Sequence, residues 1–348
     1  MTLSTALAIF GVGVLLALAA QAWWTTRRSR RRIAADSQLV ADRVEPAMGA
    51  NAGPDTEPLD PAPRLLHRKV PRLDALIDAI VPLALEAPIS GDFALLHLPP
   101  SRRAGSKPFY IEGLDAESGE WEPLAPGHRY GELQAGVQLA SRSGALNEIE
   151  YSEFVQKVQA FAETVGAEPD SPDAPDMLEV VARARELDGL ASPLDVQLTV
   201  TLRANGVSWA VAYVQQAAAR LGFVPGAVPG RLVLPSAEEG APPMLVLAVD
   251  SQAALAALSD DPQAAAVREC TLTLDVPQTP ASAEPFPAWH LAAKQLADDL
   301  DASALDGAGQ PILLHAYAVI GQELDALYAK LEALDLAAGS PAARRLFS

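Results

Sequence analysis

The chain has 348 residues, of which 49% are hydrophobic and 20% charged, and its formal net charge is −18. This length allows two globular domains, and the apolar fraction excludes a wholly disordered protein. The single cysteine, Cys270, excludes an internal disulfide scaffold and a cysteine-based zinc site. The acidic charge excludes binding of nucleic acid through a broad basic face.

The amino-terminal segment is predicted to cross a membrane. No charged side chain precedes Arg27, and the run from Thr2 to Trp24 is long enough to span a hydrocarbon core of ~30 Å as a helix. Trp23 and Trp24 end this run with amphipathic rings, which favour the membrane interface. A cluster of arginines follows at once, namely Arg27, Arg28, Arg30, Arg31 and Arg32.

These arginines predict the orientation of the span, because basic residues stay on the cytoplasmic side of a membrane. We therefore interpret residues 1–32 as a single-pass membrane anchor, with the amino terminus outside and the body in the cytoplasm. A cleavable signal peptide is the alternative, since Ala20-Gln21-Ala22 imitates a cleavage site, but no basic region precedes the apolar run. The arginines could instead bind lipid headgroups or nucleic acid, but the orientation of the membrane span by itself explains why they lie at this position.

Residues 33–69 are interpreted as a flexible linker, because they contain several prolines and lack sustained hydrophobic periodicity. Without the five arginines of the anchor, 21 of the 26 basic residues remain against 44 acidic ones. The chain after residue 32 therefore has a formal charge of −23. Anionic lipid should repel this body and keep it off the membrane surface.

The carboxyl-terminal part, residues 191–336, alternates between strand and helix patterns. Apolar residues at every second position predict strands around 196–202, 232–234, 245–249 and 272–276. Helical spacing predicts helices around 209–221, 286–300 and 311–334. Each strand is apolar on one face only, so the predicted fold class is α+β, an antiparallel sheet with helices packed on one face.

The preceding block, residues 70–190, repeats this pattern at an offset of 135 residues. Val137 corresponds to Leu272, Phe154 to Trp289, and Met177 to Ile312. Upstream, a strand at 77–85, a short helix after Ser90 and a strand at 109–114 loosely mirror the start of the second block. We therefore predict two tandem copies of one domain, followed by a tail at residues 337–348.

Motifs that would carry catalysis or bind a cofactor are missing from the sequence. It has no phosphate-binding glycine loop, no His-Glu-x-x-His and no nucleophile elbow. The histidines are far apart and lack paired ligand spacing: His67, His97, His128, His290 and His315. We predict no catalytic residue, no metal, no cofactor and no small-molecule substrate. An enzyme with its site between the two blocks is the alternative, although no set of residues points to one.

The second face of the carboxyl-terminal sheet is the candidate binding surface. The helices are predicted to cover only one side, which leaves the other open. On this open side Met244, Val246 and Ala248 form a small apolar stripe flanked by threonines. Such a stripe is typical of a shallow groove for the apolar side chains of a peptide. An ordinary solvated sheet surface is the alternative interpretation.

The whole arrangement resembles the bacterial cell-division protein ZipA family. The uncharged span, the arginine cluster, the proline-containing linker and a β-α-β-β-β-α-α domain follow one another as in that family. The segment Thr271–Pro277, the helix through Trp289–Leu300 and the helix end Ala218–Phe223 are similar to elements of its carboxyl-terminal domain. The resemblance covers about residues 193–334 and the anchor, and it rests on order and patterning.

The resemblance implies binding of the carboxyl-terminal tail of FtsZ, a tubulin-like division protein, on the open sheet face. It also implies that the protein tethers FtsZ filaments to the inner membrane during septum formation. The family's apolar groove corresponds to Thr199, Val233, Met244, Val246, Ala248 and Thr273. Thr273 replaces a large aromatic residue, the linker is shorter, and the block 70–190 is an addition.

Two further expectations remain open. The protein could be an adaptor of the same fold that recognises a different division or cell-envelope partner, which the replacement at Thr273 permits. The first block has Gln134, Gly136 and Gln138 on its corresponding strand, a poor floor for an apolar peptide. We therefore expect that block to be structural or to bind something else.

Overall fold

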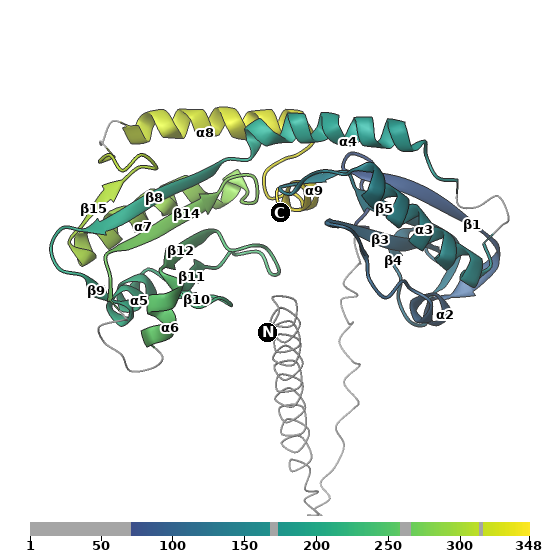
Figure 1. The fold of residues 1–348 in the computed structure, drawn as a ribbon, viewed down its shortest axis with the longest axis horizontal. Helices are drawn as coiled ribbons and strands as arrows, with labels where there is room; N and C mark the ends of the chain where they lie inside the picture. Colours follow the sequence, from purple (N-terminus) through teal and green to yellow (C-terminus); the bar gives the residue numbers. More distant parts are fainter. Residues whose placement is uncertain (1–70, 168–172, 258–265, 313–315) are drawn as a thin grey trace, which may run out of the picture. The chain divides into compact units, whose positions relative to one another are not determined.

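The computed structural model describes residues 71–167, 173–257, 266–312 and 316–348. They belong to one compact unit of the chain, His67–Ser348, and contain two antiparallel sheets with their helices (Figure 1). The predicted span at 2–24, the arginine cluster and the linker at 33–69 lie outside the described residues. Within the described ranges, none of the helices combines the length and hydropathy that a bilayer-spanning segment needs.

The first block is built on the sheet β1-β5-β3-β2, with β4 also paired to β3. Its strands are β1 (Asp78–Ser90), β2 (Arg103–Ala104), β3 (Lys107–Asp115), β4 (Trp121–Pro123), β5 (Arg129–Gln138), and the short pair β6 (Ala140–Ser141) and β7 (Gly144–Ala145). Its helices are α2 (Gly91–Leu96), α3 (Glu148–Val165) and α4 (Met177–Ala191). Polar side chains cap all three helices, from Ser90, Asn147 and Asp176.

One face of this first sheet forms the core of the block. Ala79, Val137 and Phe109 lie in one cross-strand row on β1, β5 and β3, and all three are buried. The α3 helix covers this row, and the rings of Phe154 and Phe109 meet edge-on with centroids 5.5 Å apart. Alternating apolar residues on the strands and an apolar stripe on the helix therefore close one core layer.

The second block is built on a six-stranded sheet in the order β10-β11-β12-β14-β8-β15. Its strands are β8 (Gln197–Ala204), β10 (Val224–Pro225), β11 (Arg231–Leu234), β12 (Leu245–Val249), β14 (Glu269–Asp275) and β15 (Ala302–Leu305), and β9 (Trp209–Ala210) pairs separately with β13 (Ala266–Val267). Its helices are α5 (Val211–Arg220), α6 (Ser251–Ala257), α7 (Pro285–Leu300), α8 (Ala316–Ala333) and α9 (Pro341–Leu346), with short 3-10 turns at Ser192–Leu194 and Ala281–Ala283.

The core of the second block repeats the arrangement of the first. Val200, Leu272 and Leu247 form a buried cross-strand row on β8, β14 and β12. The α7 helix covers this row, and the buried Trp289 indole N–H donates to the backbone carbonyl of Leu272 at 3.4 Å. Trp209 donates to the carbonyl of Leu300 at 2.8 Å, which ties the segment before α5 to the end of α7.

Strand order is shared by the two sheets. The order β1-β5-β3-β2 of the first sheet corresponds to β8-β14-β12-β11 of the second, with the connecting helices α2 and α5 after the first strand of each. The offset of 135 residues holds at this level, because Val137 and Leu272 occupy the same place in their rows, as do Phe154 and Trp289 in the covering helices. The described residues thus form a mixed α+β fold with antiparallel sheets.

The correspondence ends after α7. A helix starting near residue 311 is predicted from the sequence, but Pro311 bridges to Leu305 and Ile312 donates to the carbonyl of Ala304, so this stretch continues a hairpin with β15. The helix α8 begins at Ala316. Met177 and Ile312 therefore do not occupy equivalent positions in the two blocks. Met177 is the first residue of α4, whereas Ile312 lies in the hairpin with β15.

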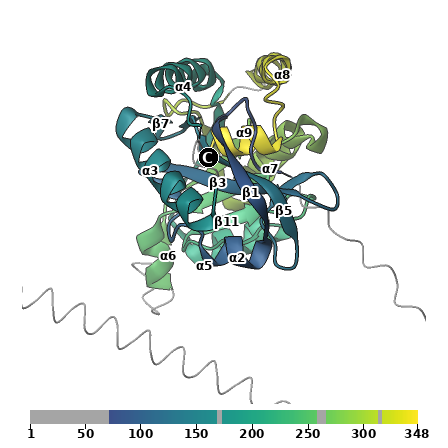
Figure 2. The same cartoon turned by 90° about the vertical axis from the view of Figure 1, so that its right-hand side faces the viewer.

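The last residues of the chain pack on the second face of the first sheet. Arg345 of α9 binds the carboxylate of Asp78 through two hydrogen bonds, at 2.5 and 2.8 Å, and its guanidinium lies 5.0 Å from the centroid of the Tyr110 ring. The side-chain amide of Gln138 donates to the carbonyl of Arg345 at 2.8 Å. Leu346 and Phe347 are buried, so the segment predicted as a tail is part of the core. Figure 2 shows the helix α9 next to the strands of the first sheet.

The ion pair of Arg345 and Asp78 should contribute strongly to stability. Arg345→Ala leaves the carboxylate of Asp78, which has no exposed side-chain surface, without its cation. Removing one partner of a buried pair costs about 3–5 kcal/mol, so we expect a clear drop in the urea midpoint of unfolding.

The matched control is Arg203→Ala, which removes an exposed ion pair with Glu269. Exposed pairs contribute about 0–1 kcal/mol, so this variant should unfold near the wild-type midpoint. Equal losses in the two variants would contradict the docking of α9 on the first sheet.

Candidate functional site

The open face of the second sheet brings most of the predicted groove residues together. Strand pairing places Val233 opposite Val246, Val246 opposite Thr273, and Thr273 opposite Thr199. These four residues therefore form one continuous row across β11, β12, β14 and β8. With strands about 4.8 Å apart, the row is roughly 14 Å long, which suits an extended or helical peptide lying across it.

The other predicted residues extend this row to both sides. Ala248 lies in the next row, between Arg231 and Thr271. Met244 comes just before β12, where its backbone N–H donates to the carbonyl of Leu234 at 2.9 Å, and its side chain packs against the core. Thr199 is exposed, and the remaining predicted groove residues are half-buried. The face is apolar in its middle and lined by threonine hydroxyls on β8 and β14.

Charged contacts border this face at both ends. At one end Arg203 on β8 pairs with Glu269 on β14 at 2.6 Å. At the other end Arg142, from the first block, binds Asp275 at 2.7 Å and Asp195 at 2.6 Å. The hydrogen bonds to Asp195 raise the pKa of Arg142 above its ordinary value, so this cation stays charged and keeps both carboxylates paired. The polar ends limit the apolar floor to the middle of the sheet.

The corresponding face of the first sheet is covered. Gln138 and Gly136 of β5 are buried, and a Cβ placed on Gly136 would lie 2.5 Å from the side chain of Leu73. The segment around Leu73 and the helix α9 therefore occupy the surface that lies open in the second block. That Gln134, Gly136 and Gln138 form a poor floor for an apolar peptide stays a prediction, because the chain itself occupies this face.

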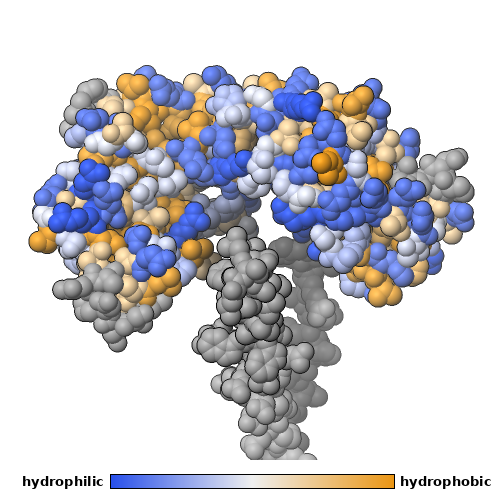
Figure 3. Space-filling model, in the orientation of Figure 1, coloured by the Kyte–Doolittle hydropathy of each residue, from blue (hydrophilic) through white to orange (hydrophobic). Residues whose placement is uncertain are grey.

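A second apolar concavity, which was not predicted, runs beside α8. It encloses about 750 Å³ between that helix and the connection from α4 to β8. Leu190, Leu194 and Leu198 line one wall, and Ile320, Leu327 and Leu334 line the other. Figure 3 shows apolar side chains gathered over α8. The heptad-like spacing of α8 was visible in the sequence, but the opposite wall comes from the connection between the blocks.

A smaller pocket of about 290 Å³ lies where the two blocks meet. Its lining includes Ser141, Arg142 and Asp195, the kind of polar groups that an enzyme between the blocks would use. Arg142 is fully engaged with carboxylates, and Ser141 accepts a hydrogen bond from the ammonium of the buried Lys107 at 2.9 Å. Arg142 connects the two blocks through Asp195 and Asp275, whereas the contact of Lys107 with Ser141 lies within the first block.

Comparison with known proteins adds no assignment: no protein-family model matches the chain, and neither does any curated protein. The predicted anchor residues Trp23, Trp24 and the arginine cluster lie outside the described residues. The open sheet face is thus characterised by its own residues and their register.

The alternation of side chains on β8 between the covered and the open face of the sheet can be tested by the reaction of introduced cysteines with a thiol reagent. Cys270 is buried on the covered face, and burial raises the pKa of its thiol to about 12. Because the thiolate is the reactive form, native protein should not react with a thiol reagent at pH 8. Thr199→Cys should add one rapidly reacting thiol, whereas Val200→Cys should add none until the protein unfolds. Fast labelling of Val200→Cys would show that the helices do not cover this face.

Proposed function

We propose that this protein is a membrane-anchored, ZipA-like division protein that binds the carboxyl-terminal tail of FtsZ on the open face of the second sheet. The observation that carries the proposal is the single cross-strand row Val233–Val246–Thr273–Thr199, of which Thr199 is exposed and the other three are half-buried. The uncharged run at 2–24 and the five arginines support a cytoplasmic body on a single inner-membrane span. The proposed role requires no catalysis.

The shared strand order of the two sheets supports a tandem repeat of one domain, with bounds near 70–190 and 191–336. In this proposal the two copies have different roles. The second face of the first copy is occupied by α9 and the segment around Leu73, and only the second copy keeps a face on which a peptide can bind. One tail should therefore bind per chain.

Binding of a single tail is expected to be weak. A shallow groove that covers a few apolar side chains gains several kcal/mol at about 25 cal/mol per Å². Ordering a flexible peptide offsets much of that gain. Many anchors facing one filament act together through their effective concentration, so micromolar single contacts are enough to hold a polymer at a membrane.

The direct test is binding of a fluorescent FtsZ tail peptide to the full chain in nanodiscs, measured by anisotropy. Val246→Glu places a charge in the middle of the row, and we expect it to weaken binding more than tenfold, which corresponds to a loss of about 1.4 kcal/mol. Met244→Glu should act in the same direction. Protection of Cys270 in each variant shows that the sheet remains folded.

The matched control is Leu190→Glu, at a half-exposed position in the α8 groove. It should leave peptide binding unchanged. Absence of binding up to about 100 μM, a free energy weaker than about 5.5 kcal/mol, contradicts the proposal, as does binding that is indifferent to both sheet substitutions.

A second candidate function rests on the apolar groove beside α8. An adaptor of the same fold could recognise a different division or cell-envelope partner, and this groove is a larger apolar concavity than a flat sheet face offers. Loss of tail binding in Leu190→Glu but not in Val246→Glu would favour the groove as the recognition site.

The anchor can be tested separately from the groove. Deleting residues 1–32 removes the predicted span and its arginines, so the truncated chain should bind the tail peptide with wild-type affinity. It should fail to recruit FtsZ filaments to vesicles in a flotation assay, because the connection to the bilayer is lost. Recruitment that survives this deletion would contradict the assignment of the anchor.

A further inference from the structure

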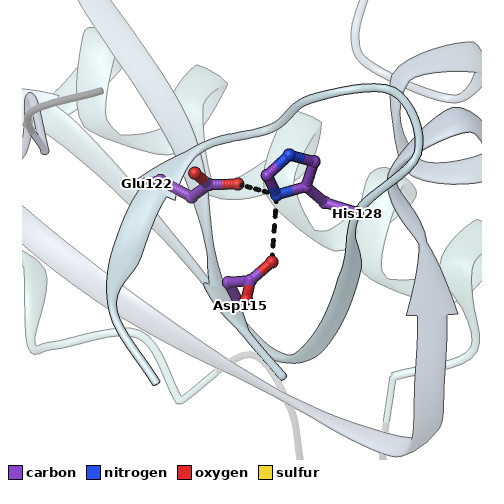
Figure 4. A group of neighbouring side chains, drawn as sticks. All are labelled: Asp115, Glu122 and His128. Carbon is purple, nitrogen blue, oxygen red and sulfur yellow. Dashed lines mark hydrogen bonds and ion pairs between the residues drawn. The ribbon is translucent and has the colours of Figure 1, made fainter. Parts of the chain in front are cut away.

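One end of the first sheet gathers three side chains with metal-binding groups. Asp115 ends β3, Glu122 lies in the middle of β4, and His128 directly precedes β5. The Nδ1 atom of His128 lies 3.0 Å from Oδ2 of Asp115 and 2.8 Å from Oε1 of Glu122 (Figure 4). The three residues are separated by six or more positions in the sequence, and strand pairing brings them together.

The two Nδ1–oxygen separations are compatible with neighbouring ligands of one six-coordinate divalent ion. With metal–nitrogen and metal–oxygen bonds of about 2.1 Å, two ligands at right angles are about 3.0 Å apart, whereas two ligands of a tetrahedral ion are about 3.4 Å apart. The separations of 3.0 and 2.8 Å are close to the first value. Without an ion, the single proton on Nδ1 of His128 has to be shared between the carboxylate oxygens of Asp115 and Glu122. A cation at this point would satisfy the lone pairs of all three atoms.

The surroundings hold the ligand atoms in place. The other oxygen of Asp115, Oδ1, accepts the backbone N–H groups of Glu117 and Ser118 at 2.9 and 2.7 Å, which directs Oδ2 toward His128. The hydroxyl of the buried Tyr130 donates to Oε1 of Glu122 at 2.7 Å and accepts the N–H of Ala125 at 2.8 Å. Outer contacts of this kind orient the residues that bind a metal.

Tyr130 can take this position only because Gly113 lies beneath its ring. A Cβ on Gly113 would lie 2.3 Å from the ring of Tyr130, so only glycine leaves room for it. Leu114 pairs with Glu132 and Asp115 with Tyr130, so Gly131 of β5 is an extra residue that forms a bulge close to His128, and bulges re-aim the side chains beside them. Backbone and ring together turn Asp115 and Glu122 toward the imidazole.

The site opens to solvent on one side. The side chain of Asp115 is 7% exposed and that of Glu122 is 16% exposed, whereas that of His128 is 44% exposed. An ion held by the three residues would therefore keep free positions for water or for an external ligand. Imidazole nitrogen is a preferred ligand of Zn²⁺, and carboxylate oxygen is a preferred ligand of Mn²⁺. A set of one imidazole nitrogen and two carboxylate oxygens therefore suits ions of either kind.

We propose that Asp115, Glu122 and His128 form a binding site for one divalent transition-metal ion of the Zn²⁺ or Mn²⁺ class. The site belongs to the first block and is independent of the proposed peptide groove on the second sheet. It assigns a binding role to a block that the tethering proposal leaves structural.

The test is isothermal titration of Zn²⁺ into the full chain in nanodiscs, with no polyhistidine tag. We expect one ion bound per chain, and the same stoichiometry for Mn²⁺ by electron paramagnetic resonance, with Zn²⁺ displacing Mn²⁺. His128→Gln and Glu122→Gln each remove one ligand from a partly exposed position and should weaken the affinity at least about 100-fold. Zn²⁺ should raise the thermal unfolding midpoint of the wild type and of neither variant.

The matched control is His97→Gln, which removes a histidine of the same block whose ring packs against Phe93, with centroids 4.6 Å apart. Its affinity and stoichiometry should equal those of the wild type. The proposal is overturned if the wild type binds neither ion, or if binding survives both His128→Gln and Glu122→Gln. Peptide binding is measured separately, so failure of the metal site leaves the tethering proposal unaffected.

Discussion

The carboxylate of Asp78 has no exposed surface, and a carboxylate in that position is stable only with a cation beside it. Arg345 supplies that cation from the end of the chain, and its guanidinium also covers the ring of Tyr110. This one interaction holds α9 on the second face of the first sheet, while Arg142 joins the same block to Asp195 and Asp275 of the second. The arrangement of both sheets within the described residues depends on these two cations, since each connects a carboxylate of one block to a guanidinium of the other.

The consequence is an asymmetry between two sheets of the same strand order. Every strand has two faces, and in both blocks the apolar face is covered by its helices. The second face is closed by the chain itself in the first block, whereas in the second block the row around Val246 remains available. A tether for a filament needs one accessible surface and a firm connection to the rest of the molecule. The row around Val246 and the ion pairs between the blocks suit this proposed role, and the first block carries the proposed metal site.

The sequence predicted the strands and helices well in segments where hydrophobic residues repeat with a single period, about two residues for a strand or 3.6 for a helix. Alternation on β8 and β14 correctly predicted which side chains are buried, and Ser90 and Asp176 cap the helices that follow them. The prediction was wrong around residue 311, where the apolar spacing of α8 was extended backward through residues that pair with β15. The side chains of β15 are Ala, Ser, Ala and Leu, which differ too little in hydropathy to show a clear alternation, so its pairing with β8 identifies it as a strand.

The amino-acid sequence by itself predicted most of the local elements, the apolar face of their strands, a repeat at 135 residues and a membrane anchor, because all of these predictions follow from neighbouring residues and their spacing. Only the tertiary structure decided that residues 341–347 cover the first sheet, that α8 and the connection between the blocks enclose a groove, and that Asp115, Glu122 and His128 converge. These features join residues that are far apart in the chain. Their contacts depend on strand register and on packing between blocks, neither of which leaves a periodic signal in the sequence.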